Sequence, residues 1–201
     1  MAAGRMKVAI LASGEGTNAE RIIRAAEKRS DIEIEVVGSN RASAGVLRRS
    51  ESLGVRTWLF SKAQLNDGTV ARELTAQGVQ FVVLMGFLLK VPDPLTQAFS
   101  GRILNLHPSL LPAFGGKGMY GDHVHEAVHS ALQQGSVVET GMTLHWVDGG
   151  YDTGAVFFQA RVALDAALDT PLSIAEKVRN LEAEHCAKEA LRAVTECLSL
   201  S

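Results

Sequence analysis

Short apolar runs alternate with longer amphipathic segments along most of this chain, and this alternation restricts the fold more than any other feature of the sequence. The apolar runs have the length of buried strands, and the segments after them carry apolar side chains at helical spacing. Repeated strand–helix units of this kind form a parallel sheet with helices on both faces. The pattern therefore predicts a doubly wound, mostly parallel α/β fold, in which ligands bind beyond the carboxyl ends of the strands.

The expected elements follow one another without a fixed repeat or a low-complexity linker. We expect strands at residues 8–12, 34–39, 55–60, 81–85, 103–106, 142–147 and 156–162. We expect helices that begin at 17, 44, 69, 92, 122 and 171, the last of which extends to 198. Residues 1–201 are thus predicted to form one domain, with an N-terminal nucleotide-binding lobe over about 6–100 and a C-terminal catalytic lobe over about 101–201.

Composition excludes several broad classes of protein. The chain has 201 residues, 46% of them hydrophobic, and a formal net charge of −2, which is typical of a globular domain without general attraction to nucleic acid or anionic lipid. The longest apolar run, residues 81–89, is about half as long as a membrane span. Two cysteines, Cys186 and Cys197, are too few for a disulfide framework. We therefore expect a cytoplasmic protein that binds neither membranes nor nucleic acid.

A glycine-rich loop at residues 13–16 joins the first strand to the first helix. Thr17 and Glu20 have the spacing of a capping box, and the glycines leave the helix N-terminus open to a phosphate. The loop favours a mononucleotide or a sugar phosphate. Two alternatives stay open: an NADP site in which Arg41 accepts the 2′-phosphate, and a glycine turn that binds nothing.

A second motif predicts different chemistry. The segment His125-Glu126-Ala127-Val128-His129 matches the H-E-x-x-H pattern of zinc hydrolases, and His145 or Glu139 is available as the third ligand. The simpler interpretation is that these histidines lie on a helix surface. A zinc hydrolase therefore stays as an alternative, beside a non-catalytic module that binds a sugar phosphate.

Two further segments carry candidate acid–base chemistry. Asn105 and His107 end a buried strand, where an amide stabilises a developing oxyanion and an imidazole carries a proton. A glycine-rich loop at residues 146–154 contributes Asp148 and Asp152. If Asp152 lies beside His107, its charge raises the pKa of His107 and fixes the orientation of the ring. The alternatives are a core histidine bonded to a carbonyl group, and a turn whose aspartates bond their own backbone.

Taken in order, four segments resemble the folate-dependent formyltransferase family, and the resemblance runs from about residue 7 to 182. They are residues 13–18, 86–88, 105–112 and 148–154. The resemblance implies a Rossmann-like fold and transfer of the formyl group of 10-formyltetrahydrofolate, used as a co-substrate without a metal. The first loop resembles the branch whose acceptor is the amine of 5′-phosphoribosylglycinamide. Members that act on tRNA carry an additional C-terminal domain, so we expect small-molecule substrates and a monomer or weak homodimer.

Residue roles follow from the same resemblance. The implied catalytic residues are Asn105, His107 and Asp152. The implied ribonucleotide-binding residues are Gly16, Thr17, Asn18 and Glu182. The implied folate-binding residues are Leu88, Leu89, Lys90, Val91, Asn105, Asp148 and Asp152. Many family members have an arginine where this sequence has Leu89 followed by Lys90, so the contacts to the glutamate tail of the folate differ.

Overall fold

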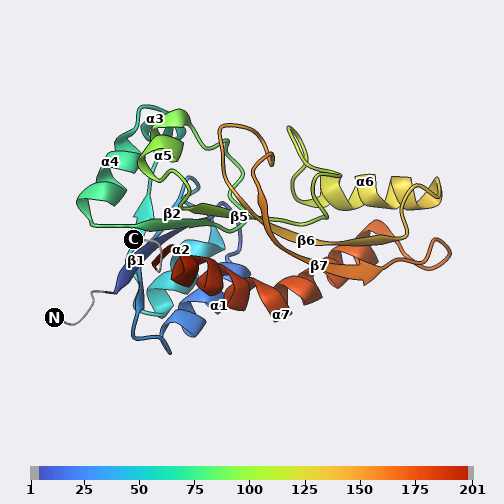
Figure 1. Ribbon diagram of the computed structural model, residues 1–201, viewed down its shortest axis with the longest axis horizontal. Helices are drawn as coiled ribbons and strands as arrows, with labels where there is room; N and C mark the ends of the chain where they lie inside the picture. The colour runs from blue at the N-terminus through green and yellow to red at the C-terminus, as the bar shows by residue number, and fades with distance from the viewer. Residues whose placement is uncertain (1–4, 199–201) are drawn as a thin grey trace.

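A computed structural model describes residues 5–198, and a seven-stranded sheet runs through this part of the chain (Figure 1). The strand order is β3-β2-β1-β4-β5-β6-β7. The first five strands in this order, from β3 to β5, are parallel to one another. Strand β6 is antiparallel to β5, and β7 is antiparallel to β6. The strands are β1 (Met6–Leu11), β2 (Ile32–Ser39), β3 (Thr57–Leu59), β4 (Phe81–Leu84), β5 (Ile103–His107), β6 (Glu139–Trp146) and β7 (Val156–Ala163). The predicted doubly wound, mostly parallel fold is confirmed.

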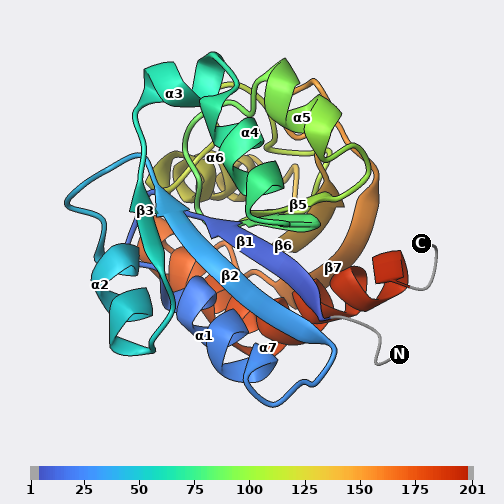
Figure 2. The same cartoon turned by 90° about the vertical axis from the view of Figure 1, so that its left-hand side faces the viewer.

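Helices cover both faces of the sheet (Figure 2). The helices on one face are α1 (Thr17–Ala26), α2 (Gly45–Ser52) and α7 (Pro171–Leu198). Those on the other face are α3 (Lys62–Asn66), α4 (Thr69–Ala76) and α5 (Asp93–Ala98). The remaining helix, α6 (Asp122–Gln133), packs against the first part of α7 through Val124, Val128 and Ile174.

Strand β1 explains why continuous apolar runs mark the centre of the sheet. Val8 and Ile10 point into the core under α1 and α7, whereas Ala9 and Leu11 point into the core under α4 and α5. None of these four side chains is exposed. Because successive residues of a strand face opposite sides, a strand covered on both faces needs an apolar residue at every position.

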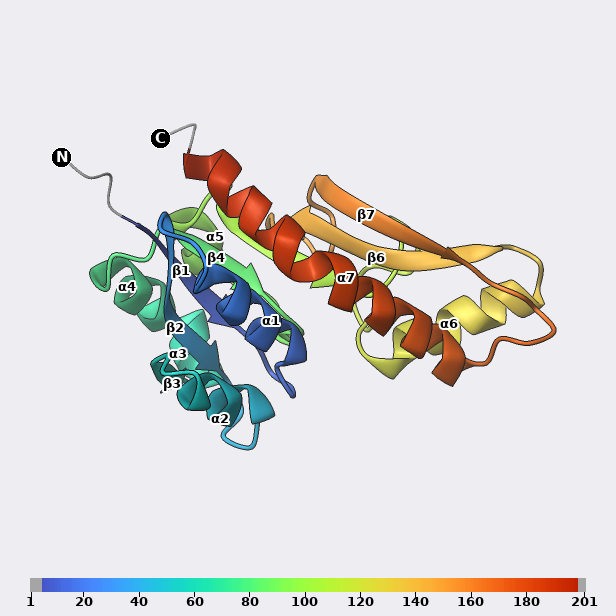
Figure 3. The same cartoon turned by 90° about the horizontal axis from the view of Figure 1, so that it is seen from below.

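Helix α7 connects the two ends of the molecule (Figure 3). One end packs on α1 and the core that contains Cys186 and Val194, and the other end packs against α6, β6 and β7. The same helix carries Glu182 past the N-terminus of α1. None of the helices in residues 5–198 is long and apolar enough to cross a membrane.

Three local predictions were wrong. Helix α3 was not expected, although Ser61 and Gln64 form a reciprocal capping box at its start. Strand β3 is shorter than the expected 55–60, because only Thr57–Leu59 pairs with β2. The residue that caps α1 is Gly16 and not Thr17, and no side chain caps this helix.

Candidate active site

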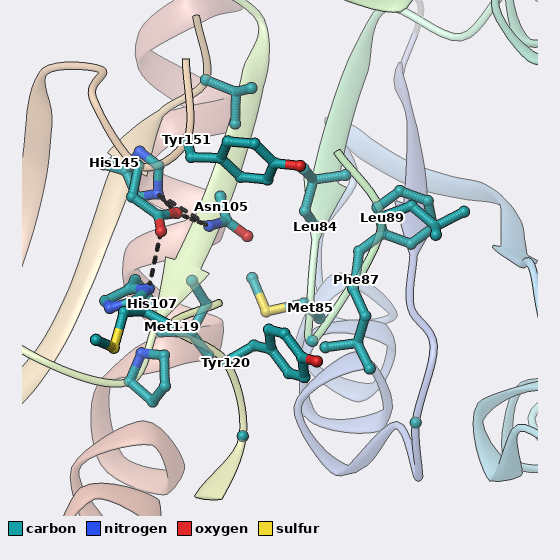
Figure 4. A pocket seen from close by; sticks show the side chains of 18 of the residues that line it. Leu84, Met85, Phe87, Leu89, Asn105, His107, Met119, Tyr120, His145 and Tyr151 are labelled. Carbon is teal, nitrogen blue, oxygen red and sulfur yellow. Dashed lines mark hydrogen bonds and ion pairs between the residues drawn. The ribbon is translucent and has the colours of Figure 1, made fainter. Parts of the chain in front are cut away.

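A cavity of about 670 Å³ opens at the carboxyl ends of β1, β4 and β5 (Figure 4). The chain leaves β1 toward β2 on one side and leaves β4 toward β5 on the other, so neighbouring strands β1 and β4 mark the point where the strand order reverses. In open α/β sheets this is the place where ligands bind. All of the predicted site residues line the cavity: Gly16, Thr17, Asn18, Leu88, Leu89, Lys90, Val91, Asn105, His107, Asp148, Asp152 and Glu182.

The first loop is shaped by Gly16. Its φ of 79° is left-handed, its carbonyl oxygen accepts a hydrogen bond from the N–H of Glu20 at 2.9 Å, and a Cβ at this position would lie 2.5 Å from Val46. The capping box expected between Thr17 and Glu20 is not formed, because the carboxylate of Glu20 pairs with Arg24 and Arg49. The first N–H groups of α1 have no partner within the helix, as is general at helix N-termini, and residues 14–18 at this end of the helix line the cavity.

Asn18 connects this loop to α7. Its Nδ2 donates to Glu182 Oε2 at 2.8 Å, and its Oδ1 accepts from Arg21 at 2.8 Å. Burial raises the pKa of Glu182, although the hydrogen bond from Asn18 and the charges of Arg21 and Arg179 act in the opposite direction. Two residues assigned to the ribonucleotide from the sequence are thus in direct contact.

Ser13 connects the first loop to the loop after β4. The Ser13 hydroxyl donates to Asn40 Oδ1 at 2.6 Å and accepts from the N–H of Leu88 at 3.0 Å. Ser13 therefore sets the position of the segment 88–91 that lines the other side of the cavity. Arg41, the candidate for a 2′-phosphate, is exposed and does not line this cavity, which argues against the NADP interpretation.

Asn105, His107, His145 and Asp152 form a polar cluster in the cavity, and Figure 4 labels the first three. Asn105 on β5 faces His145 on β6 in the antiparallel register, and its Nδ2 lies 2.9 Å from His145 Nε2 and 3.5 Å from Asp152 Oδ1. Asp152 Oδ2 lies 3.6 Å from His107 Nδ1 and accepts from the N–H of Gly116 at 3.0 Å. One carboxylate therefore joins both histidines.

His107 lies between a backbone carbonyl group and the carboxylate of Asp152. Its Nε2 lies 2.8 Å from the carbonyl oxygen of Phe114, which only accepts, so Nε2 carries a hydrogen. Burial lowers the pKa of His107, and the neighbouring charge of Asp152, which raises it, does not compensate. The charge of Asp152 thus acts on His107 in the predicted direction, but burial has the larger effect and the net shift of the pKa is downward.

Asp152 itself stays ionised. Burial works to raise the pKa of Asp152, but the hydrogen bond to His145, the N–H of Gly116 and the charge of His107 hold this pKa below its usual value. Asp148 differs, because its Oδ1 accepts from the N–H of Gly150 and from the Thr153 hydroxyl. These two hydrogen bonds lower the pKa of Asp148 and fix its side chain within its own turn. The alternative of an aspartate that bonds the backbone of its own turn therefore holds for Asp148 and not for Asp152.

Two strained backbone positions hold His107. Phe114 and Asp152 both have a φ of 55°, and no other residue in 5–198 except glycine has a positive φ. Phe114 supplies the carbonyl group on one side of the ring, and Asp152 supplies the carboxylate on the other. Such conformations typically cost about 1–3 kcal/mol each and concentrate at functional sites. They indicate that the orientation of His107 is selected at the expense of stability.

The residues of the zinc interpretation do not converge. His145 belongs to the cluster with Asp152, whereas Glu139 lies at the other end of β6 and pairs with Arg161. His125 is buried, while Glu126 is exposed. Within residues 5–198 no group of three or more His, Cys, Asp or Glu side chains is placed to hold a metal ion. The alternative of a zinc hydrolase is therefore not supported.

His145 is the site residue whose role was missed. The sequence suggested it only as a metal ligand, but its Nδ1 lies 2.9 Å from the carbonyl oxygen of Trp146, which requires a hydrogen on Nδ1. Its Nε2 lies 2.9 Å from Asn105 Nδ2 and 3.5 Å from Asp152 Oδ1. The signal for this contact is the register between β5 and β6, which appears only once the antiparallel pairing is known.

The class of protein follows from three features together. A doubly wound sheet, a glycine loop at its switch point and a buried cluster of Asn, His and Asp side chains are typical of α/β enzymes. The sequence profile of the family described as formyl transferase matches residues 6–190, and the chain belongs to this family.

Similar proteins come from bacteria and plants. The phosphoribosylglycinamide formyltransferase of Bacillus subtilis is 33% identical over 182 residues, which are 88% of each protein. The chloroplastic phosphoribosylglycinamide formyltransferase of Arabidopsis thaliana is 39% identical over 188 residues, 90% of this chain, and this chain spans only 62% of the plant protein. Glycinamide ribonucleotide transformylase 1 from Symbiobacterium toebii has a crystal structure with a TM-score of 0.80 and 34% identity, covering 95% of this chain and 89% of that one.

Proposed function

We propose that this chain transfers the formyl group of 10-formyltetrahydrofolate to the amine of 5′-phosphoribosylglycinamide, a step of purine biosynthesis. The names of the bacterial and plant relatives support the acceptor. The observation that carries the proposal is the cluster of Asn105, His107 and Asp152, which lies between the two loops suited to the two substrates.

The two substrates occupy opposite sides of the cavity. The open N–H groups of Gly16, Thr17 and Asn18 and the positive end of α1 bind the phosphate, and Glu182 accepts hydrogen bonds from the ribose hydroxyls. The segment 88–91, with the backbone of 148–152, holds the folate. Lys90 lies over the Tyr151 ring, 5.5 Å from its centroid, at the position where the family's arginine is absent.

The reaction forms one C–N bond and breaks another. The amine attacks the formyl carbon, and negative charge develops on the formyl oxygen. The contact from Asn105 Nδ2 to Asp152 is long, at 3.5 Å, so this amide hydrogen is available to the oxyanion. The proton lost by the amine goes to the pair formed by Asp152 and His107, and the protonated pair then stabilises the oxyanion. The same proton passes to N10 of the folate as the bond from N10 to the formyl carbon breaks.

The proposal is tested by following formyl transfer spectroscopically with purified protein, 10-formyltetrahydrofolate and the ribonucleotide. We expect turnover that requires both substrates and that is lost in Asn105→Ala, His107→Ala and Asp152→Asn while the fold is kept. Near wild-type turnover in all three variants contradicts the assigned site. Release of formate without the ribonucleotide contradicts the transfer reaction and indicates a deformylase instead.

The same proposal places the enzyme in the cytoplasm with small-molecule substrates only. Cys186 and Cys197 do not form a disulfide, which suits a reducing compartment. Whether the chain is a monomer or a weak homodimer stays a prediction, and sedimentation at several protein concentrations measures it.

A further inference from the structure

His125 lines the cavity at the end of the first turn of α6 and has no part in the chemistry above. Its side chain is buried, with 8% of the residue exposed. Its Nδ1 is enclosed and has no hydrogen-bond partner in residues 5–198, a condition shared there only by Arg49 Nε and Thr140 Oγ1. Any group in the cavity that contacts this ring therefore meets it through the other nitrogen, Nε2.

The unpartnered Nδ1 fixes the tautomer of His125. An N–H group enclosed without an acceptor is rarer in proteins than an unused lone pair, so the hydrogen is on Nε2. Burial lowers the pKa of His125, and Arg179 and His107 lower it further against the opposing charge of Asp122, which agrees with a ring that carries no hydrogen on Nδ1. Because Nδ1 is the enclosed nitrogen, Nε2 is the one left open, and it is an N–H donor on a residue of the cavity wall.

The surroundings of His125 indicate which substrate it meets. Arg179 lies one turn before Glu182 on α7, and both line the cavity with His107 and His125. Helix α6 packs against α7, so His125 on α6 lines the cavity together with Arg179 and Glu182 on α7. An oxygen that carries negative charge is the acceptor favoured by an N–H donor beside an arginine.

We propose that His125 is a binding residue for the ribonucleotide, with its Nε2–H donating to an oxygen of the phosphate or of the glycinamide carbonyl. This inference rests on the proposed function, because that function assigns the ribonucleotide to this side of the cavity. It gives the H-E-x-x-H segment a role in substrate binding through its first histidine alone.

Three substitutions separate the two ring nitrogens. In His125→Gln the side-chain amide reaches the place of Nε2, in His125→Asn it reaches only the place of Nδ1, and His125→Leu removes both. We expect the KM for the ribonucleotide to rise about fivefold to tenfold in the Leu and Asn variants, the effect of one hydrogen bond, and to stay within about twofold in the Gln variant. The KM for 10-formyltetrahydrofolate stays unchanged in all three.

Thermal unfolding separates binding from a structural role. His125→Leu removes an enclosed atom that has no partner, so its unfolding temperature should not fall below that of the wild type. An unchanged KM for the ribonucleotide in the Leu and Asn variants overturns the inference. A lower unfolding temperature, with both KM values raised together, also overturns it, since that result describes a packing residue.

Ribose 5-phosphate as a competitive inhibitor locates the acceptor oxygen. If His125 binds the phosphate, the inhibition constant rises in His125→Leu by the same factor as the KM; if it binds the glycinamide carbonyl, only the KM rises. Failure of the proposed function is distinguishable, because the wild type then shows no formyl transfer. In that case calorimetric titration of the ribonucleotide into wild type and His125→Leu decides the inference alone, and equal affinities contradict it.

Discussion

The two polar regions of the cavity are built in different ways. The loop before α1 offers backbone N–H groups, and its shape depends on Gly16 in a left-handed conformation. The cluster around His107 offers side chains, and its geometry depends on buried contacts between β5, β6 and the strained residues Phe114 and Asp152. In the proposed function, the first region binds the phosphate through its backbone, whereas the second takes up and releases a proton through its side chains.

This difference implies different sensitivities. A region built from backbone groups tolerates changes of side chain where there is space and fails where the backbone shape changes. A region built from side chains fails when one functional group is replaced by another of the same shape. Substitutions of the two kinds should therefore affect KM in one region and kcat in the other.

The largest effect is expected from Asp152→Asn. The amide is similar in size to the carboxylate but accepts no proton, so we expect kcat to fall about 10³-fold, within the usual range for general acid–base catalysis, with little change in the KM for the ribonucleotide. Stopped and continuous assays of formyl transfer measure both constants. Asp165→Asn is the matched control, because Asp165 Oδ1 accepts only within a turn outside the cavity. A mainly KM effect in Asp152→Asn contradicts the contrast between the regions.

The next largest effect is expected from Gly16→Ala. A Cβ here meets Val46 at 2.5 Å, and the φ of 79° disfavours alanine by about 1–2 kcal/mol. We expect the KM for the ribonucleotide to rise about tenfold or more through distortion of the first loop, with a lower unfolding temperature and a smaller change in kcat. Gly14→Ala is the control two residues away, since a Cβ there has no atom of the described chain within 4 Å. Equal effects of the two substitutions contradict the role given to the backbone of Gly16.

Much of the fold follows from local patterns, and the exceptions have local causes. Strands β1 and β4 were predictable because both of their faces are covered, which requires continuous apolar runs. Helix α3 was missed because it has five residues and buries only Leu65, too little for a periodic pattern. Thr17 was misassigned as a cap because its spacing to Glu20 suits a capping box, while the left-handed conformation of Gly16 leaves no visible signal beyond the residue type.

The site was predictable in its membership more than in its electrostatics. The strand ends and glycine loops indicated Asn105, His107 and Asp152, and the structure places all three on one cavity. The net shift in the pKa of His107 was not predictable, because burial depends on every element packed around the ring. His145 was missed because its contact with Asn105 depends on the register of β5 and β6. These two strands are separated in the sequence by the 31 residues of segment 108–138.

A smaller effect is expected from Ser13→Ala, which tests the link between the two loops. Its hydroxyl bonds both Asn40 and the N–H of Leu88, so its loss frees the segment 88–91 without removing a group that contacts either substrate. We expect the KM for the folate to rise about threefold, with kcat nearly unchanged. Ser50→Ala is the control, since Ser50 is equally buried but donates to Val46 within α2. A raised folate KM in both variants would indicate a general loss of stability.

The smallest effect concerns stability against pH, and it separates the two regions without substrate. The pKa of His107 in the folded protein lies below the ordinary value of 6.5 that applies when unfolded, mainly through burial. The unfolded chain therefore binds more protons as the pH falls below about 6.5, and stability is lost from there down to the folded pKa. His107→Gln keeps an N–H for the carbonyl of Phe114 but does not titrate, so its unfolding temperature should fall less than that of the wild type between pH 7 and pH 5. Gly16→Ala should fall as much as the wild type, because this substitution neither adds nor removes a titrating group. Calorimetric unfolding at both pH values measures these differences, and an equal fall in all three proteins means that burial of His107 does not control its protonation.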